Sequence, residues 1–164
     1  MPELPDVEIY KRKIEKKAIH KEIKKVDVDI AKILEGISIK DFQKSLKNKA
    51  FSKVERHGKY LFVEATNRKW VLYHFGMTGD VAFKKTKNEM PKHSRIIIQF
   101  QDSSIFAYIS QRLLGKLKII DSVENFIEDK KIGKDALNIN KKEVNSIFQG
   151  RGNIKTTLMN QNKI

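Results

Sequence analysis

The sequence predicts an α+β fold that is mainly antiparallel β, with an N-terminal helix on a β-sandwich, followed by a truncated helical segment. Apolar side chains recur at helical spacing in residues 5–19. Short β-rich segments then follow to about residue 120, separated by turns and not by long helices, which favours an antiparallel sandwich or barrel. Helix-start signals return after about residue 121. We therefore divide the chain into residues 1–131, the helix with the sandwich, and residues 132–164, a linker with the start of an incomplete helical domain.

The predicted first helix has one apolar face and one basic face. At its N-terminal end, Pro5 suits the first helical turn, and the charges of Asp6 and Glu8 favour the positive end of the helix dipole. The apolar face consists of Val7, Tyr10, Ile14 and Ala18. This face is therefore the one expected to pack against the sandwich.

The predicted strands are rich in β-branched and aromatic residues and end at turn-forming Gly, Asn, Asp or Ser residues. A short helix is expected over Ile39–Leu46, after the first of them. The strand segments are 23–30, 60–64, 70–75, 96–100, 105–108 and 116–120.

Two further helices are predicted near the C-terminus. Asn140 and Glu143 have the spacing of a capping box ahead of an apolar run. Asn153 is placed to cap a second helix that passes through Leu158 and Met159 and reaches the C-terminus without a stop signal. A final helix of this kind, with little to pack on, is typical of a domain that has been cut off.

Composition limits the classes of function. The 164 residues, about one domain's worth, include 40% hydrophobic residues and no cysteine. The chain therefore offers no disulfide, Cys nucleophile or Cys-liganded zinc finger. No apolar run approaches about 18 residues, and the first residues lack the basic and apolar regions of a signal peptide. We expect an intracellular protein in the cytoplasm or nucleoid, with no membrane partner.

The charge balance predicts a polyanionic partner. Lys and Arg number 34 against 20 Asp and Glu, a net charge of +14. Nucleic acid is the first expectation, because neutralising phosphates releases counterions, and an anionic membrane surface is the second. The joint excess of Lys, Ile and Asn is also what A/T-biased coding produces, so charge alone leaves both readings open.

The first residues carry the most specific chemistry. Removal of Met1 leaves Pro2 with a free secondary amine, and such amines are partly unprotonated near neutral pH. Attack of this amine on the anomeric carbon of a deoxynucleotide would expel the base and leave an iminium, from which the adjacent phosphate can be eliminated. Glu3 could move protons and Asp6 could assist. The alternative is an ordinary helix start, and retention of Met1 would make the Pro2 nitrogen an unreactive amide.

Five segments, in order, resemble the formamidopyrimidine-DNA glycosylase and endonuclease VIII family. Residues 2–8 (Pro-Glu-Leu-Pro-Asp-Val-Glu) resemble the family's opening, and Leu4 favours the formamidopyrimidine branch. The other matches are residues 57–61 (His-Gly-Lys-Tyr-Leu), 74–79 (His-Phe-Gly-Met-Thr-Gly), 132–137 (Ile-Gly-Lys-Asp-Ala-Leu) and 154–161 (Ile-Lys-Thr-Thr-Leu-Met-Asn-Gln). The last resembles the first helix of the family's helix–two-turn–helix motif, so the resemblance spans the whole chain.

The resemblance implies roles for particular residues. Pro2 would be the nucleophile and Glu3 the acid and base, while Asp6 stands where the family usually has the longer Glu. Lys59 matches a catalytic lysine that approaches the lesion's phosphate, and His74 matches a phosphate contact. The alternatives are a solvated surface lysine and an ordinary histidine at a strand end.

The resemblance also implies residues that fill the gap left by an extruded base. Met77, in a turn flanked by glycines, matches the family's wedge methionine, and the alternative is a core methionine. Arg112 matches the arginine that faces the orphaned base. Leu113 replaces a second arginine, so one phosphate contact is lost, and Leu114 replaces a phenylalanine wedge. We therefore expect weaker discrimination of the opposite base than in typical members.

The function implied is a base-excision repair DNA glycosylase with abasic-site lyase activity (β/δ-elimination) on oxidised purines such as 8-oxoguanine. The expected partner is double-stranded DNA with oxidised bases or abasic sites, bound by a monomer. No cofactor is expected, because the nucleophile belongs to the chain, and the family's C-terminal zinc finger is absent from this chain. Two alternatives remain: a non-catalytic DNA-binding fragment or reduced homologue lacking the C-terminal half of the DNA clamp, and a structural nucleic-acid-associated protein.

Overall fold

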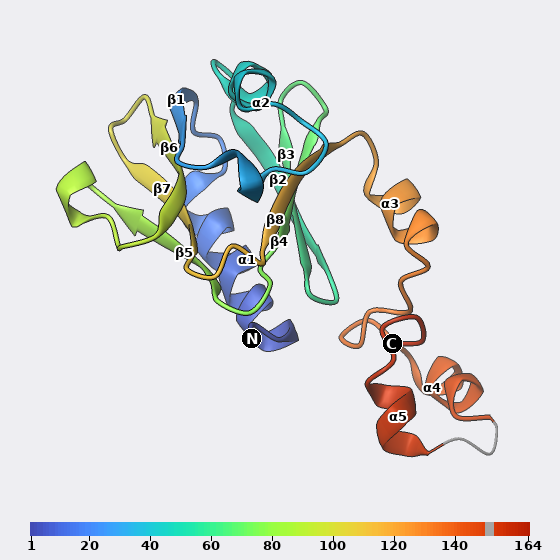
Figure 1. The fold of residues 1–164 in the computed structure, drawn as a ribbon. Helices are drawn as coiled ribbons and strands as arrows, with labels where there is room; N and C mark the ends of the chain where they lie inside the picture. Colours follow the sequence, from blue (N-terminus) through green and yellow to red (C-terminus); the bar gives the residue numbers. More distant parts are fainter. Residues whose placement is uncertain (150–152) are drawn as a thin grey trace. The chain divides into compact units, whose positions relative to one another are not determined.

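The computed structural model describes residues 1–149 and 153–164, which form two compact units, Met1–Asp121 and Ser122–Ile164 (Figure 1). The first unit ends with the last strand, ten residues before the end of the predicted 1–131 part, because Ser122 caps a new helix directly after that strand.

The first unit contains two helices and two antiparallel sheets, which confirms the predicted fold class. One sheet has the strand order β1-β6-β7-β5 and the other the order β2-β3-β4-β8. The helices are α1 (Leu4–Ala18) and α2 (Ile39–Leu46). The strands are β1 (Ile23–Val28), β2 (Phe51–His57), β3 (Tyr60–Ala65), β4 (Trp70–His74), β5 (Gly79–Lys84), β6 (Ser94–Phe100), β7 (Ile105–Ser110) and β8 (Lys116–Ile120).

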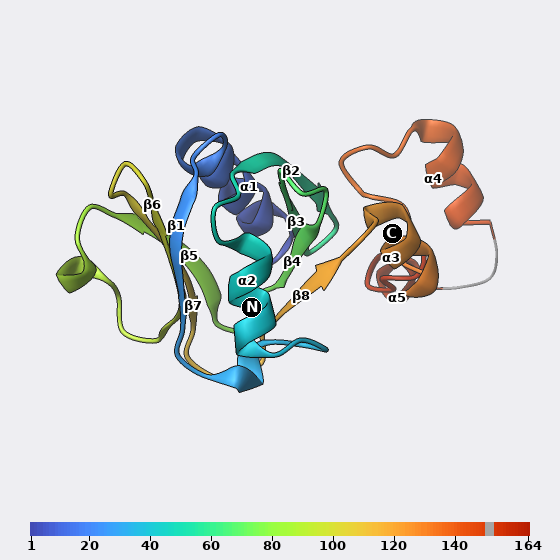
Figure 2. The ribbon, with the colours of Figure 1, turned by 90° about the horizontal axis from the view of Figure 1, so that it is seen from above.

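Helix α1 packs against both sheets. It contacts β2 and β3 of one sheet and β5 of the other, and Figures 1 and 2 show a sheet on either side of it. Val7, Ile14 and Ala18, three members of the predicted apolar face, are buried in this position. The N-terminal end of α1 is thereby fixed relative to the turns that join the strands.

Two strands were not anticipated by the pattern. β2 and β5 lie at the edges of their sheets, where charged side chains are tolerated because one side of the strand faces solvent. Lys53 and Glu55 in β2, and Asp80 in β5, interrupt the apolar signal that marks the inner strands.

The described residues of the second unit form three short helices: α3 (Val123–Asp129), α4 (Lys141–Ile147) and α5 (Ile154–Leu158). The predicted capping box is confirmed, because Asn140 Oδ1 accepts from the Glu143 backbone N–H and Glu143 Oε2 accepts from that of Asn140, each at 3.0 Å. Asn153 caps α5 as predicted. The helix does not reach the C-terminus, however: it ends at Leu158, and turns follow.

Candidate active site

The N-terminal end of α1 holds three of the predicted catalytic residues. Pro2 is partly exposed and lies just ahead of the helix, and Glu3 is the residue that caps it. Asp6 Oδ2 accepts a hydrogen bond of 2.8 Å from the backbone N–H of Glu3. The shorter carboxylate of Asp6 therefore orders the backbone next to Pro2.

Lys59 joins this group from the turn between β2 and β3. Its Nζ lies 2.6 Å from Glu3 Oε2, with the Lys59 side chain 29% exposed and the Glu3 side chain 50% exposed. The structure thus brings a lysine to the capping carboxylate from a distant part of the chain, and both charges remain accessible to solvent.

An ion pair between a buried arginine and a partly exposed glutamate holds α1 to the turn that carries Lys59. Arg56 Nε lies 3.0 Å from Glu8 Oε2 and its Nη1 donates to the Gly58 carbonyl at 2.9 Å, with only 4% of the Arg56 side chain exposed. Burial alone raises the pKa of Glu8, but hydrogen bonds from Arg56 and Arg12 outweigh it, so the pKa lies below its usual value. Sequence reasoning gave Glu8 a role at the helix dipole and missed this pairing, for which local spacing gives no signal.

His74 ends β4 beside Lys59 and Tyr60. Its ring lies 5.4 Å from the Tyr60 ring, centroid to centroid. Burial lowers the pKa of His74, the positive charge of Lys59 lowers it further, and Glu35 partly opposes both. The imidazole is therefore neutral at neutral pH and can contact a phosphate through a hydrogen bond rather than through charge.

Met77 projects from the turn between β4 and β5. Its side chain is 45% exposed, which contradicts the alternative of a core methionine. Gly76, before it, has a φ of +57°, and a Cβ there would lie 2.6 Å from the backbone N of Gly115. Position 76 therefore requires glycine for two reasons: its backbone is left-handed, and it lies close to the neighbouring turn.

That neighbouring turn, between β7 and β8, carries the other predicted DNA contacts. The Arg112 backbone N–H donates to Thr78 Oγ1 at 3.2 Å, and Arg112 Nη1 lies 3.7 Å from Met77 Sδ. Leu114 is 49% exposed. Two apolar side chains and one guanidinium, which the resemblance predicts to act together, thus lie on two adjoining turns.

Leu113 faces the other way. Its φ is +55°, an uncommon value for a residue with a side chain, and it is partly buried against the hydrophobic core. The residue that replaces an expected arginine is therefore a packing residue of this turn.

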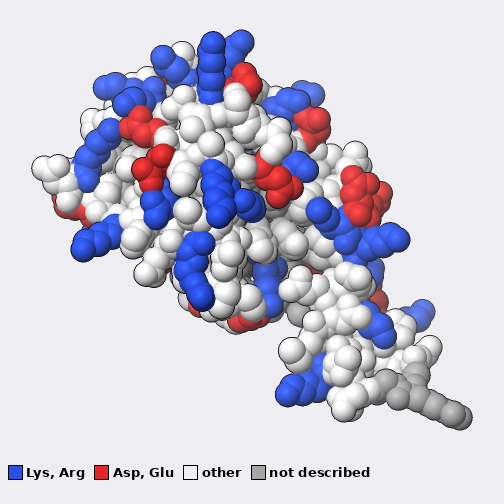
Figure 3. All heavy atoms as spheres, viewed as in Figure 1, with Lys and Arg blue, Asp and Glu red and all other residues white. Residues whose placement is uncertain are grey.

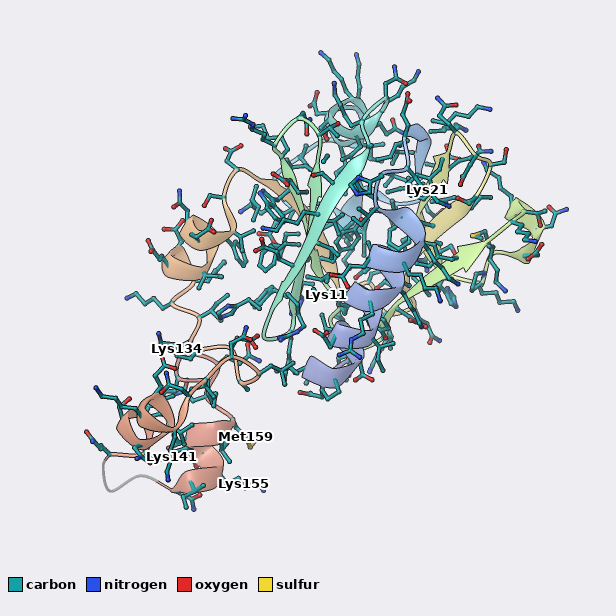
Figure 4. The ribbon with its side chains drawn as sticks, turned by 180° about the vertical axis from the view of Figure 1, so that it is seen from behind. Lys11, Lys21, Lys134, Lys141, Lys155 and Met159 are labelled. Carbon is teal, nitrogen blue, oxygen red and sulfur yellow. The ribbon has the colours of Figure 1, made fainter. Side chains whose placement is uncertain are left out.

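Lys and Arg are scattered over the face drawn in Figure 3, with fewer Asp and Glu between them. Some lysines of the chain are paired: Lys11 Nζ lies 3.2 Å from Glu15 Oε1, and Lys21 Nζ lies 2.7 Å from Asp102 Oδ2 (both lysines are labelled in Figure 4). We therefore identify the candidate site by its geometry and not by charge alone.

The described residues offer neither a metal site nor a membrane-spanning helix. Among the described residues, no group of three or more His, Cys, Asp or Glu side chains is arranged to hold a metal ion. In the same part of the chain, no helix combines the length and the apolar character needed to cross a bilayer.

The chain was then compared with known proteins. The family model of the formamidopyrimidine-DNA glycosylase N-terminal domain matches residues 1–117. The formamidopyrimidine-DNA glycosylase of Mycoplasma mobile is 32% identical over 130 residues, which cover 79% of this chain and 47% of that protein. That of Trichormus variabilis is 29% identical over an alignment that covers 100% of this chain and 62% of that protein. The chain thus spans about half to two thirds of the length of these relatives.

Solved structures show the same fold. The Lactococcus lactis formamidopyrimidine-DNA glycosylase bound non-covalently to AP-site DNA superposes with a TM-score of 0.85 at 24% identity, covering 98% of this chain and 63% of that one. The wild-type L. lactis protein in complex with DNA containing N7-benzyl-Fapy-dG gives 0.85 at 25% identity, covering 98% and 61%. By the match over residues 1–117, the chain belongs to the formamidopyrimidine-DNA glycosylase family.

Proposed function

We propose that this chain carries the catalytic N-terminal part of a base-excision repair DNA glycosylase with abasic-site lyase activity, and that Pro2 is its nucleophile after removal of Met1. The observation that supports this most directly is the group at the N-terminal end of α1. Pro2 adjoins Glu3, which Asp6 orders through the backbone and Lys59 meets at 2.6 Å. An amine, a carboxylate and a cation within one small region are the groups that the reaction needs.

The reaction follows from these groups. The Pro2 nitrogen forms a bond to C1′ of the deoxyribose as the bond from C1′ to the base breaks, and the base leaves with a proton. The sugar ring then opens, its ring oxygen takes up a proton, and an iminium joins Pro2 to C1′. Because the iminium withdraws electrons, a C2′ proton can be removed and the 3′ phosphate expelled. Glu3 moves these protons, and Lys59 binds phosphate at the lesion.

The projecting turns would act on the DNA duplex. Extruding a base leaves a hole in the stack, and exposed apolar side chains such as Met77 and Leu114 are suited to fill it. Arg112 beside them would face the orphaned base, and His74 would contact a phosphate. The substrates proposed are double-stranded DNA with oxidised purines or abasic sites, and the protein would act as a monomer in the cytoplasm or nucleoid, with no cofactor.

Borohydride trapping tests the proposal. The protein, with Met1 removed, is mixed with an 8-oxoguanine duplex or an abasic duplex, and borohydride reduces any iminium to a stable adduct. We expect a covalent band with both duplexes, weakened in Pro2→Gly, which exchanges the secondary amine for a primary one, and lost in protein that retains Met1, whose Pro2 nitrogen is an amide. Pro5→Ala is the matched control, because Pro5 lies within the same helix start but has no amine to expose; it should keep the band.

The second candidate function is DNA binding without chemistry. It is favoured by the net charge of +14 and by the chain's coverage of only 47% of the M. mobile relative. A gel shift that weakens steeply with salt, together with no adduct on either duplex, would support this candidate and overturn the first. An adduct with the abasic duplex alone would mean that the amine is active while base recognition requires residues outside this chain.

A further inference from the structure

Two tyrosine hydroxyls hold the two ends of the turn that carries Met77. Tyr108 Oη donates to the carbonyl of His74 at 2.9 Å, just before the turn. Tyr10 Oη donates to the carbonyl of Gly79 at 3.3 Å, at its end. The tyrosines come from β7 and α1, so neither belongs to the β4–turn–β5 segment, which passes from one sheet to the other.

The same two rings pack on the residue beneath the turn. The Phe75 ring lies 4.7 Å from the Tyr10 ring and 5.7 Å from the Tyr108 ring, centroid to centroid. Phe75 is only 2% exposed and Tyr108 is 0% exposed. Aromatic pairs at these distances stabilise one another beyond the area that they bury. Three packed rings, those of Phe75, Tyr10 and Tyr108, therefore lie beneath the turn that exposes Met77.

Tyr108 also fixes the second turn. A Cβ on Gly115 would lie 1.9 Å from Tyr108 Oη, so the backbone that leads from Arg112 into β8 passes directly over this hydroxyl. Arg112 in turn is joined to the first turn through Thr78. One phenol therefore sets the positions of both turns.

Both hydroxyls remain donors throughout the physiological range. Burial raises the pKa of Tyr108 well above its usual value. Burial, and then the nearby Asp80 carboxylate, do the same for Tyr10. The two hydroxyls therefore stay protonated, and able to donate these hydrogen bonds, near neutral pH.

We propose that Tyr10 and Tyr108 are positioning residues, which form a clamp that keeps the Met77 turn rigid enough to push into a DNA stack. The inference rests on the proposed function: extruding a base costs unstacking energy, and a wedge on a yielding turn would bend instead of displacing the base. Because Tyr10 belongs to the helix that presents Pro2, the clamp also keeps the wedge in register with the nucleophile.

The first test needs no DNA. Tyr108→Phe and Tyr10→Phe each remove one hydroxyl and keep the ring. Tyr73→Phe is the matched control: the Tyr73 ring lies 5.9 Å from that of Tyr108, but its buried hydroxyl has no hydrogen-bond partner among the described residues. Hydrogen exchange is measured for the peptide covering residues 75–79 in the free protein. We expect exchange about 5-fold faster in Tyr108→Phe, less in Tyr10→Phe because its bond is longer, and no change in Tyr73→Phe. Equal exchange in all four proteins would overturn the clamp.

The second test separates the clamp from general stability and from the proposed function. Unstacking is followed by the fluorescence of 2-aminopurine beside the lesion in bound DNA, and amine chemistry by borohydride trapping on the abasic duplex. We expect about a 5-fold loss of unstacking rate in Tyr108→Phe, with the trapped adduct within 2-fold of the wild type. If Tyr108→Phe lowered the unstacking rate and the trapped adduct equally, and Tyr73→Phe did the same, Tyr10 and Tyr108 would have only a structural role. Absence of an adduct in the wild type itself would overturn the proposed function, and hydrogen exchange would still decide the clamp.

Discussion

The N-terminal end of α1 and the Met77 turn are built by opposite means. Glu3 and Lys59, which meet at the helix end, have side chains 50% and 29% exposed and are joined to each other by an exposed ion pair. The Met77 turn lies on the buried rings of Phe75 and Tyr108, and glycine backbone is pressed against its neighbours. Exposed ion pairs contribute less than about 1 kcal/mol and can exchange one partner for a phosphate. The close contacts under the Met77 turn are buried, so the residues that make them cannot exchange a partner for a phosphate.

The comparison teaches where the two demands of the proposed reaction are met. Proton transfer and phosphate binding need charges that remain free to change partner. Displacing a base needs a protein turn whose conformation stays fixed. Mutations at the helix end should therefore alter chemistry with little effect on stability, and mutations under the turn should do the reverse.

The strongest way to break the buried region is Gly115→Ala. The new Cβ would lie 1.9 Å from Tyr108 Oη and 2.7 Å from the His74 carbonyl oxygen, so both turns must shift. We expect a loss of about 3 kcal/mol in the free energy of unfolding, measured by urea denaturation. Gly36→Ala is the control: its φ of +71° strains an alanine, but nothing lies within 4 Å, and about 1 kcal/mol is expected. Equal losses in the two variants would contradict the close packing of the turns.

At the helix end, Lys59→Ala tests the opposite behaviour. The Glu3–Lys59 pair is solvated, so the free energy of unfolding should change by less than about 0.5 kcal/mol. The amount of adduct trapped on the abasic duplex should fall by about 10-fold, since a charge-assisted contact to phosphate is lost. Lys69→Ala removes a lysine that also forms an exposed ion pair, with Asp121, and it should leave trapping unchanged. A large loss of stability in Lys59→Ala would place this lysine among the structural residues.

His74 joins the two regions, and its pH dependence sharpens the comparison. Its pKa in the folded protein lies below the usual 6.5, chiefly because of burial, so the unfolded chain binds more protons as pH falls through this range. The contribution of His74 to stability is therefore complete above pH 6.5 and is lost as pH falls below it. We expect the loss between pH 7 and 5.5 to be smaller in His74→Gln, by less than about 1 kcal/mol because the ring is only half-buried.

The sequence predicted the parts of the fold that depend on local patterns. Helix Ile39–Leu46 was predicted with its observed bounds, because an N-cap serine and apolar spacing lie within a few residues of each other. Two of the four edge strands, β2 and β5, were not predicted, because their charged residues interrupt the apolar pattern and resemble loop residues. Motif matching singled out Pro2, Lys59 and Met77 as candidate site residues. It could not identify the contacts that hold these residues in place, because pairs such as Glu8 with Arg56, or Tyr10 with Gly79, depend on how distant elements pack.

The smallest expected effect concerns the exposed tip of the second turn. Leu114 is 49% exposed beside Arg112, but an aliphatic side chain fills a gap in a base stack less completely than a planar ring. Arg112 should then be held loosely against the orphaned base, so the wild type should excise 8-oxoguanine at similar rates opposite cytosine and opposite adenine. Leu114→Phe should raise the preference for cytosine by about 3-fold, or roughly 0.7 kcal/mol, in single-turnover excision.

Leu113→Phe is the control for that change, because Leu113 packs inward and a ring there cannot reach the DNA stack. It should alter stability and leave the base preference of folded protein as it was. A strong preference for cytosine in the wild type would contradict the expectation of similar excision rates opposite cytosine and adenine. It would mean that Arg112, fixed by Thr78 and the turn beneath it, reads the opposite base without help from an aromatic wedge.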